Sequence, residues 1–99
     1  MSGAPDEARV AARAVVRGRV QGVWFRAWAV ETATALGLDG WVRNRRDGSV
    51  EALFAGAPDA VERMLVACRT GPPRARVTGV ERHDAEPDAE AGFRALPTA

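Results

Sequence analysis

The sequence lacks the means to form an internal disulfide, because Cys68 is the only cysteine among its 99 residues. Its stability must therefore come from packing, which suits the reducing conditions of the cytoplasm. It also lacks an apolar stretch long enough to span a bilayer, and its N-terminus shows no charged segment followed by an apolar one. We therefore predict a cytoplasmic protein that is neither exported nor embedded in a membrane.

The sequence is equally poor in metal-binding side chains. Its single histidine, His83, falls in a polar stretch that we expect to be a solvated turn. No group of histidine, cysteine and carboxylate residues has the spacing of metal ligands, and Cys68 lies on an apolar helix face where we expect it to pack rather than react. We predict no metal site and no cofactor.

Lysine is missing as well, so all 14 basic residues are arginines, and the net charge is only +1. This balance argues against a protein whose main task is to attract nucleic acid. Most arginines in so arginine-rich a chain are expected to be solvated surface residues, and position must decide which of them has a function. At this length one hydrophobic core is normal, and we expect a single, monomeric domain at residues 10–97 after a flexible arm at residues 1–9.

The order of secondary structure follows from hydrophobic periodicity and from the glycine and proline residues that begin or end helices and turns. Alternation predicts a first strand at residues 10–17, and a helical apolar face runs from Phe25 to Leu36, where Gly37 should end the helix. Asp47-Gly48 favours a tight turn between strands at residues 41–46 and 49–55. Pro58 should begin a second helix that stops at Gly71. Strands at about residues 75–82, where Gly79 suggests a bulge, and 92–96 complete the chain.

This order, βαββαβ with a short extra C-terminal strand, predicts an α+β fold. Two helices on one face of an antiparallel sheet form the ferredoxin-like sandwich.

The connection between the first strand and the first helix has the features of an anion-binding loop. It reads GRVQGVWFR from Gly18 to Arg26, and it leads into a helix N-terminus, where amide N–H groups converge and the helix dipole is positive. Glycines let an oxyanion approach the backbone closely, and Arg26 could bridge two phosphate oxygens. The alternative is a tight turn with glycines for geometry and an exposed arginine. The loop lacks the lysine and Ser/Thr of a nucleotide-binding P-loop, so phosphate alone fits it better.

Three segments carry a resemblance to a known family. They are VRGRVQGVWFR at residues 16–26, GLDGWVRNRRDGSVEALFAG at residues 37–56 and CRTGPPRARVTGVE at residues 68–81. Together they resemble acylphosphatases, and the likeness covers roughly residues 10–96. The resemblance implies a hydrolase that cleaves acyl phosphates to a carboxylate and inorganic phosphate.

The resemblance also implies roles for particular residues. Arg26 would bind the phosphate, Asn44 would position the attacking water, and loop amides would complete the phosphate cradle. The predicted phosphate-binding residues are Gln21, Gly22, Val23, Trp24, Phe25 and Arg26. For Asn44 the alternative is a hairpin residue that caps nearby backbone groups.

The expected partner is a small acyl phosphate, with inorganic phosphate as product and competitor. We expect the protein to bind neither nucleic acid nor a membrane. Two other functions remain open: an acylphosphatase-like module that binds phosphate without significant turnover, and an RNA-binding sandwich that uses aromatic residues exposed on its sheet.

Overall fold

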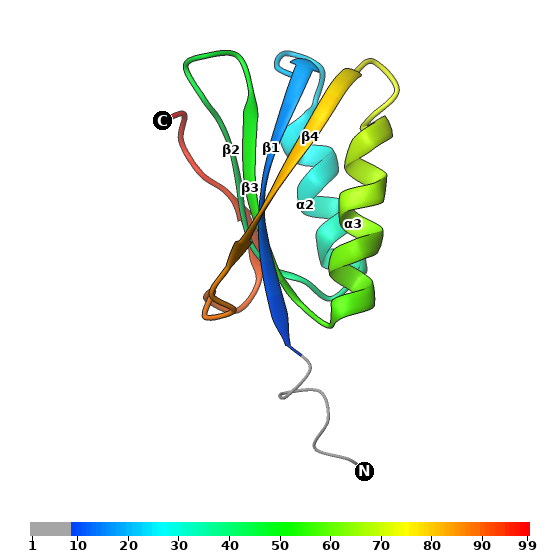
Figure 1. Ribbon diagram of the computed structural model, residues 1–99. Helices are drawn as coiled ribbons and strands as arrows, with labels where there is room; N and C mark the ends of the chain where they lie inside the picture. Colours follow the sequence, from blue (N-terminus) through cyan, green and yellow to red (C-terminus); the bar gives the residue numbers. More distant parts are fainter. Residues whose placement is uncertain (1–8) are drawn as a thin grey trace.

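The computed structural model describes residues 9–99. It consists of a five-stranded sheet that two helices cover on one face (Figure 1). Along the chain the elements are β1 (Val10–Arg19), α2 (Phe25–Ala35), β2 (Asp39–Asn44), β3 (Val50–Gly56), α3 (Pro58–Thr70), β4 (Arg76–Ala85) and β5 (Phe93–Ala95). The predicted ferredoxin-like α+β fold is confirmed. Residues 1–8 of the predicted N-terminal arm lie outside the described residues, and the domain boundaries stay a prediction.

The strands follow the order β4-β1-β3-β2-β5 across the sheet. Four of them pair in antiparallel fashion, as predicted, but β5 runs parallel to β2. The expectation of a wholly antiparallel sheet was therefore wrong at this edge. The short segment at residues 92–96 predicts an edge strand, but so few residues carry no information on the direction of the neighbouring strand. Within residues 9–99 neither helix is long and apolar enough to cross a membrane.

The core lies between the helices and the sheet, and its composition follows the predicted helix faces. In α3, Val61, Met64, Leu65 and Cys68 are all buried, as their spacing predicted. Burial raises the pKa of the Cys68 thiol to about 12, so the thiol remains protonated at neutral pH. The prediction that Cys68 packs in the core is confirmed.

Helix α2 ends in the way that Gly37 predicted. The Leu38 amide donates to the carbonyl of Ala33 at 2.9 Å, and the Gly37 amide donates to that of Thr34 at 3.0 Å. These two bonds are the Schellman pattern, which satisfies carbonyls that the helix leaves unpaired. Leu38 is buried and folds back on the helix, so β2 begins at once with Asp39.

The β2–β3 hairpin differs from the predicted two-residue turn. The ladder ends at the pair Asn44–Val50, and the Gly48 amide donates to the Arg45 carbonyl at 3.1 Å, so Arg46 and Asp47 are the central turn residues. Gly48 follows with φ +94°, a backbone angle that favours glycine. This is the longer, bulged type of hairpin connection, in which glycine comes after the turn rather than within it.

Strand β4 continues to Ala85, three residues beyond its predicted end. His83 therefore lies in a strand and not in a turn, although it is exposed as expected, and it pairs with Arg13 of β1. The polar sequence of residues 83–85 concealed the strand because β4 is an edge strand whose residues are mostly exposed. The bulge expected near Gly79 is confirmed, since Arg17 pairs with Gly79 and Gly18 pairs with Val77.

Candidate active site

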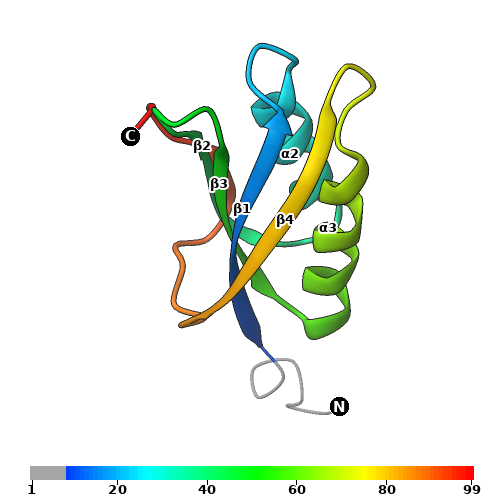
Figure 2. The same ribbon diagram turned by 45° about the horizontal axis from the view of Figure 1, so that its top comes forward.

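Three connections gather at one end of the molecule: the β1–α2 loop, the β2–β3 hairpin and the α3–β4 turn (Figures 1 and 2). A pocket of about 500 Å³ opens at this end. It is lined by residues of the first loop, of the start of α2, of the end of β2 and of β5: Val20, Gly22, Trp24, Phe25, Arg26, Ala27, Asn44 and Ala95. Arg26 and Asn44, which are far apart in the sequence, thus line the same pocket.

The loop presents its backbone to this pocket. Val20 and Val23 are buried and anchor the loop, whereas Gly22 between them is exposed, with φ +74°. Apart from Gly22 itself and its two chain neighbours, no heavy atom lies within 4 Å of the position that a Cβ of Gly22 would take, so an anion can approach the main chain there. Within residues 9–99 no protein acceptor takes the amides of residues 21–24, and the first amides of α2 lack intrahelical partners by geometry. The loop therefore offers converging N–H donors at the positive end of a helix.

Arg26, the second residue of α2, is exposed and has no carboxylate within ion-pair distance in the described part of the chain. Several other arginines are ion-paired. Arg13 and Arg43 pair with Glu51 at 3.0 and 2.9 Å, and Arg17 pairs with Glu81 at 2.6 Å. The structure thus separates Arg26, whose guanidinium is available to an anion, from arginines held by carboxylates.

A second pocket of about 430 Å³ adds to the positive charge around the loop. It also borders Gly22, and its lining includes Arg19, Arg74 and Arg76. None of these three arginines is ion-paired within residues 9–99. Their combined field should draw anionic substrates toward this end of the molecule.

Asn44 is the last residue of β2, and its backbone is held from both sides. It pairs with Val50 of β3, and its carbonyl accepts a bond from the Ala99 amide at 3.0 Å. Its side-chain amide makes no hydrogen bond to any other described residue. The capping alternative finds no support, and both the donor and the acceptor of the amide are available in the pocket.

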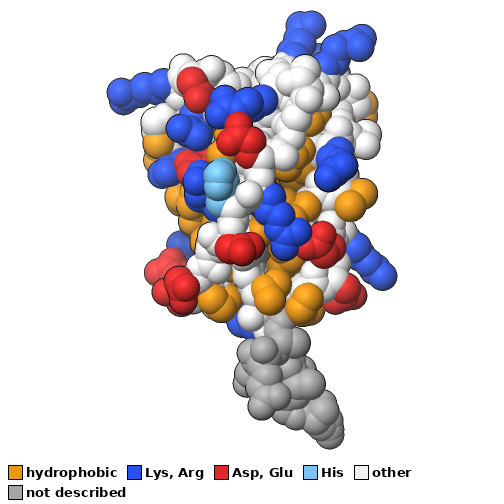
Figure 3. All heavy atoms as spheres, viewed as in Figure 1, with side chains coloured by type: hydrophobic (Ala, Val, Ile, Leu, Met, Phe, Trp, Pro, Cys, Tyr) orange, Lys and Arg blue, Asp and Glu red, His pale blue; other side chains and the backbone are white. Residues whose placement is uncertain are grey.

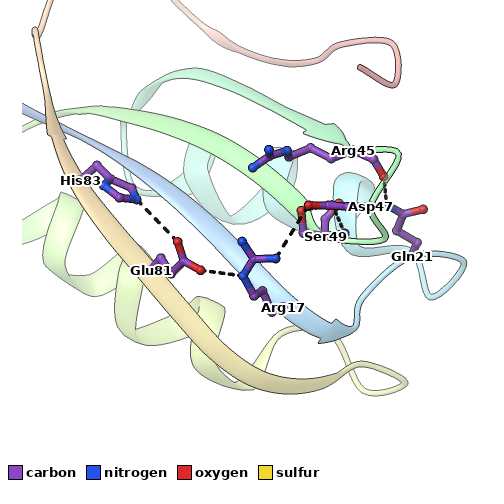
Figure 4. Close-up of polar contacts among 7 residues, drawn as sticks. All are labelled: Arg17, Gln21, Arg45, Asp47, Ser49, Glu81 and His83. Carbon is purple, nitrogen blue, oxygen red and sulfur yellow. Dashed lines mark hydrogen bonds and ion pairs between the residues drawn. The ribbon is translucent and has the colours of Figure 1, made fainter.

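Gln21 links the loop to the hairpin. Its side-chain Nε2 donates to the carbonyls of Arg45 at 2.7 Å and of Ser49 at 2.8 Å, and Figure 4 shows the first of these bonds. The sequence indicated only the backbone amide of Gln21, because no local signal marks a side-chain contact to residues 24 and 28 positions away. Because Arg45 directly follows Asn44, the Gln21 side chain ties the backbone around Arg26 to the backbone around Asn44.

We expect Gln21→Ala to lower both stability and activity. It removes the donor to two partly buried carbonyls, a loss that costs about 1–3 kcal/mol of unfolding free energy when acceptors stay unsatisfied. The loop and the hairpin should then shift relative to each other, and kcat/KM for an acyl phosphate should fall about tenfold or more. Urea unfolding and steady-state kinetics measure the two effects.

Arg45→Ala is the matched control for stability, because Gln21 bonds to the Arg45 carbonyl and this variant keeps that carbonyl. It should unfold at nearly the wild-type urea concentration. If Gln21→Ala also kept wild-type stability and kcat/KM, the side chain would not hold the loop to the hairpin.

A line of charged groups runs from β4 across β1 to the hairpin turn (Figure 4). Arg17 contacts Glu81 at 2.6 Å and Asp47 at 3.7 Å, and His83 Nε2 lies 3.6 Å from Glu81. The Arg17 guanidinium lowers the pKa of Glu81, while bonds from the Ser49 hydroxyl and amide lower the pKa of Asp47. Both carboxylates therefore remain ionised well below neutral pH, and the Asp47 carboxylate helps to fix the turn beside Asn44 through its bonds from Ser49.

The predicted phosphate-binding residues do not all line the pocket. Gly22, Trp24, Phe25 and Arg26 do, but the Gln21 side chain faces the hairpin and the Val23 side chain is buried in the core. For Gln21 and Val23 only the backbone amides remain candidates. Three further residues line the pocket without a signal in the sequence that predicts it: Val20, Ala27 and Ala95. Among residues 9–99 no three His, Cys, Asp or Glu side chains are grouped so that they could hold a metal ion.

The sequence profile of one known family, acylphosphatase, matches residues 12–95, which include every residue that lines this pocket. The chain belongs to the acylphosphatase family. A protein named acylphosphatase from Rhizorhabdus wittichii is 55% identical over 98 residues, which is 99% of each chain. The prediction of an enzyme of this family, which hydrolyses acyl phosphates, is confirmed.

Solved acylphosphatase structures share the fold as well. That of the Coxiella burnetii protein superposes with a TM-score of 0.90 at 29% identity, covering 96% of this chain and all of that one. That of the Bacillus subtilis protein gives 0.85 at 34% identity, covering 88% of this chain and 98% of that one. The pocket described above therefore belongs to an acylphosphatase scaffold.

Proposed function

We propose that this acylphosphatase cleaves the carboxyl–phosphate bond by in-line attack of a water that Asn44 positions on a phosphoryl group held by Arg26 and the loop amides. The observation that carries the proposal is the convergence of Arg26, Asn44 and the exposed Gly22 backbone on one pocket. Arg26 supplies a fixed charge, the loop supplies N–H donors, and Asn44 supplies a neutral group that can orient a water.

Cleavage of an acyl phosphate requires few catalytic groups beyond these. The water oxygen bonds to phosphorus as the phosphorus–oxygen bond to the acyl group breaks, and the carboxylate leaves without a proton because its pKa is roughly 4. Asparagine is a poor base, so the proton of the water passes to a phosphate oxygen of the substrate. Phosphoryl transfer is loose, with charge spread over the equatorial oxygens, and clamping these oxygens and aligning the water can account for catalysis.

The decisive experiment compares hydrolysis of benzoyl phosphate with hydrolysis of a phosphate monoester. An acyl phosphate should be turned over far faster, because an alkoxide leaving group needs a proton that no side chain of the pocket is suited to give. If the protein bound phosphate but turned over neither compound, the alternative of a binding module would hold instead.

Inorganic phosphate should inhibit competitively, because the loop recognises the tetrahedral anion itself. Added phosphate should raise the apparent KM for benzoyl phosphate and leave kcat unchanged. Sodium chloride at matched ionic strength is the control, since it screens charge without offering a tetrahedral anion. A lowered kcat with an unchanged KM would put the anion site outside the substrate pocket.

The RNA-binding alternative finds little support. Among the described residues, the exposed large hydrophobic side chains are Trp24 and Val66, and neither lies in a strand. Several charges on the strands are paired. Burial opposes ionisation of Glu51, but bonds from Arg43 and Arg13 outweigh it and lower the pKa of Glu51. Figure 3 shows acidic and basic groups interspersed around the histidine. A sheet that binds RNA instead presents exposed aromatic side chains.

Other parts of the hypothesis stay predictions: a monomer in the cytoplasm that acts without metal or cofactor on small acyl phosphates, and that binds neither nucleic acid nor membranes. A gel-filtration profile tests whether the protein is a monomer, and turnover in the presence of EDTA tests whether it acts without a metal.

A further inference from the structure

Trp24 has a conformation and an exposure that neither core packing nor helix capping explains. It stands at the N-cap of α2 with φ +67°, and within residues 9–99 no other non-glycine residue has a positive φ. Its side chain makes no capping bond, and the residue is 75% exposed. Asparagine tolerates this backbone better than tryptophan does. An outlier of this kind, held at a pocket, points to a role in binding.

The pocket itself has a polar and an apolar part. Arg26 and Asn44 are its polar side chains, whereas Val20, Trp24, Phe25, Ala27 and Ala95 present apolar groups. Its volume of about 500 Å³ exceeds what a phosphate alone needs and lies in the range of pockets for small organic ligands. No carboxylate lines it, so a cationic acyl group would find no partner there. The space left beside the phosphoryl group therefore suits an uncharged apolar group.

We infer that Trp24, Ala27 and Ala95 form a subsite for the acyl group, and that this subsite favours acyl phosphates of aromatic carboxylic acids over acetyl phosphate. The two alanines leave room for a flat ring, and the exposed indole offers it a face for stacking. This inference rests on the proposed function, because it assigns the acyl half of the same substrate. In this inference the Trp24 side chain determines specificity for the acyl group, whereas the Trp24 backbone amide belongs to the proposed phosphate cradle.

The test compares kcat/KM for benzoyl phosphate with kcat/KM for acetyl phosphate in the wild type and in Trp24→Gly, Trp24→Asn and Trp24→Phe. Glycine and asparagine both accept the positive φ, so these variants should fold. The benzoyl-to-acetyl ratio should fall about tenfold in both, the scale of one aromatic contact, and should be largely kept in Trp24→Phe. The ratio cancels any loss that a change in the loop backbone imposes on both substrates.

Val66→Ala is the matched control, because it trims the other exposed large hydrophobic side chain, on the outer surface of α3, and should leave the ratio unchanged. An unchanged ratio in Trp24→Gly and Trp24→Asn would overturn the inference. Binding of benzoylphosphonate and acetylphosphonate, measured by calorimetry, repeats the comparison without turnover. If the wild type hydrolysed neither acyl phosphate, the proposed function would fail, and the ratio of phosphonate affinities would still decide whether the subsite exists.

Discussion

Replacing Arg26 by alanine should lower kcat/KM for benzoyl phosphate by about 10³-fold, and replacing it by lysine should be nearly as damaging. An arginine that clamps a transferring phosphoryl group acts on charge that spreads over several oxygens in the transition state. Its planar guanidinium can contact two of these oxygens at once, whereas the ammonium group of lysine is a point charge on a flexible stem. Steady-state hydrolysis of benzoyl phosphate by the three proteins measures the effect.

The fold should tolerate both changes at position 26. Arg26 is exposed and makes no ion pair or side-chain hydrogen bond with another described residue, so thermal unfolding should change little. Arg63→Ala, which removes an exposed arginine from α3, is the matched control for the loss of one positive charge. If Arg26→Lys kept most of the wild-type kcat/KM, charge alone would suffice and the two-oxygen contact would be wrong.

Asn44→Ala should lower kcat by about 10²-fold or more while phosphate affinity changes little. Arg26 and the loop amides would hold the anion in the ground state and in the transition state alike, whereas Asn44 matters once a water must stand in line with the leaving carboxylate. Loss of one preorganised hydrogen-bonding group has effects of this size. Calorimetry with inorganic phosphate gives the affinity, and benzoyl phosphate hydrolysis gives kcat.

Stability is the necessary control for Asn44→Ala, because Asn44 ends the strand that leads into the hairpin. Its structural bonds to Val50 and Ala99 run through the backbone, which alanine retains, so urea unfolding should stay close to that of the wild type. A folded variant that binds phosphate poorly but reaches the wild-type kcat at saturation would make Asn44 a binding residue and would contradict its role in positioning water.

Local signals predicted most of the fold. The apolar face of α3, the proline at its start and the glycine after each helix act within a few residues, and the structure reproduces them. The errors lie where a local signal was ambiguous. His83 and Asp84 suggested a polar turn, although residues 83–85 pair with β1 at the edge of the sheet. Asp47-Gly48 suggested a two-residue turn, although Gly48 follows the turn.

The sequence by itself determined the order of the elements, the family, and Arg26 and Asn44 as candidate catalytic residues. Periodicity, helix ends and motifs each depend on residues that are close together in the sequence. Only the tertiary structure decided that β5 runs parallel to β2, that the Gln21 side chain bonds to the hairpin, and that Ala95 lines the same pocket as Trp24. These contacts join residues far apart in the chain. Their geometry depends on how the whole sheet and both helices pack, and no short stretch of sequence carries that information.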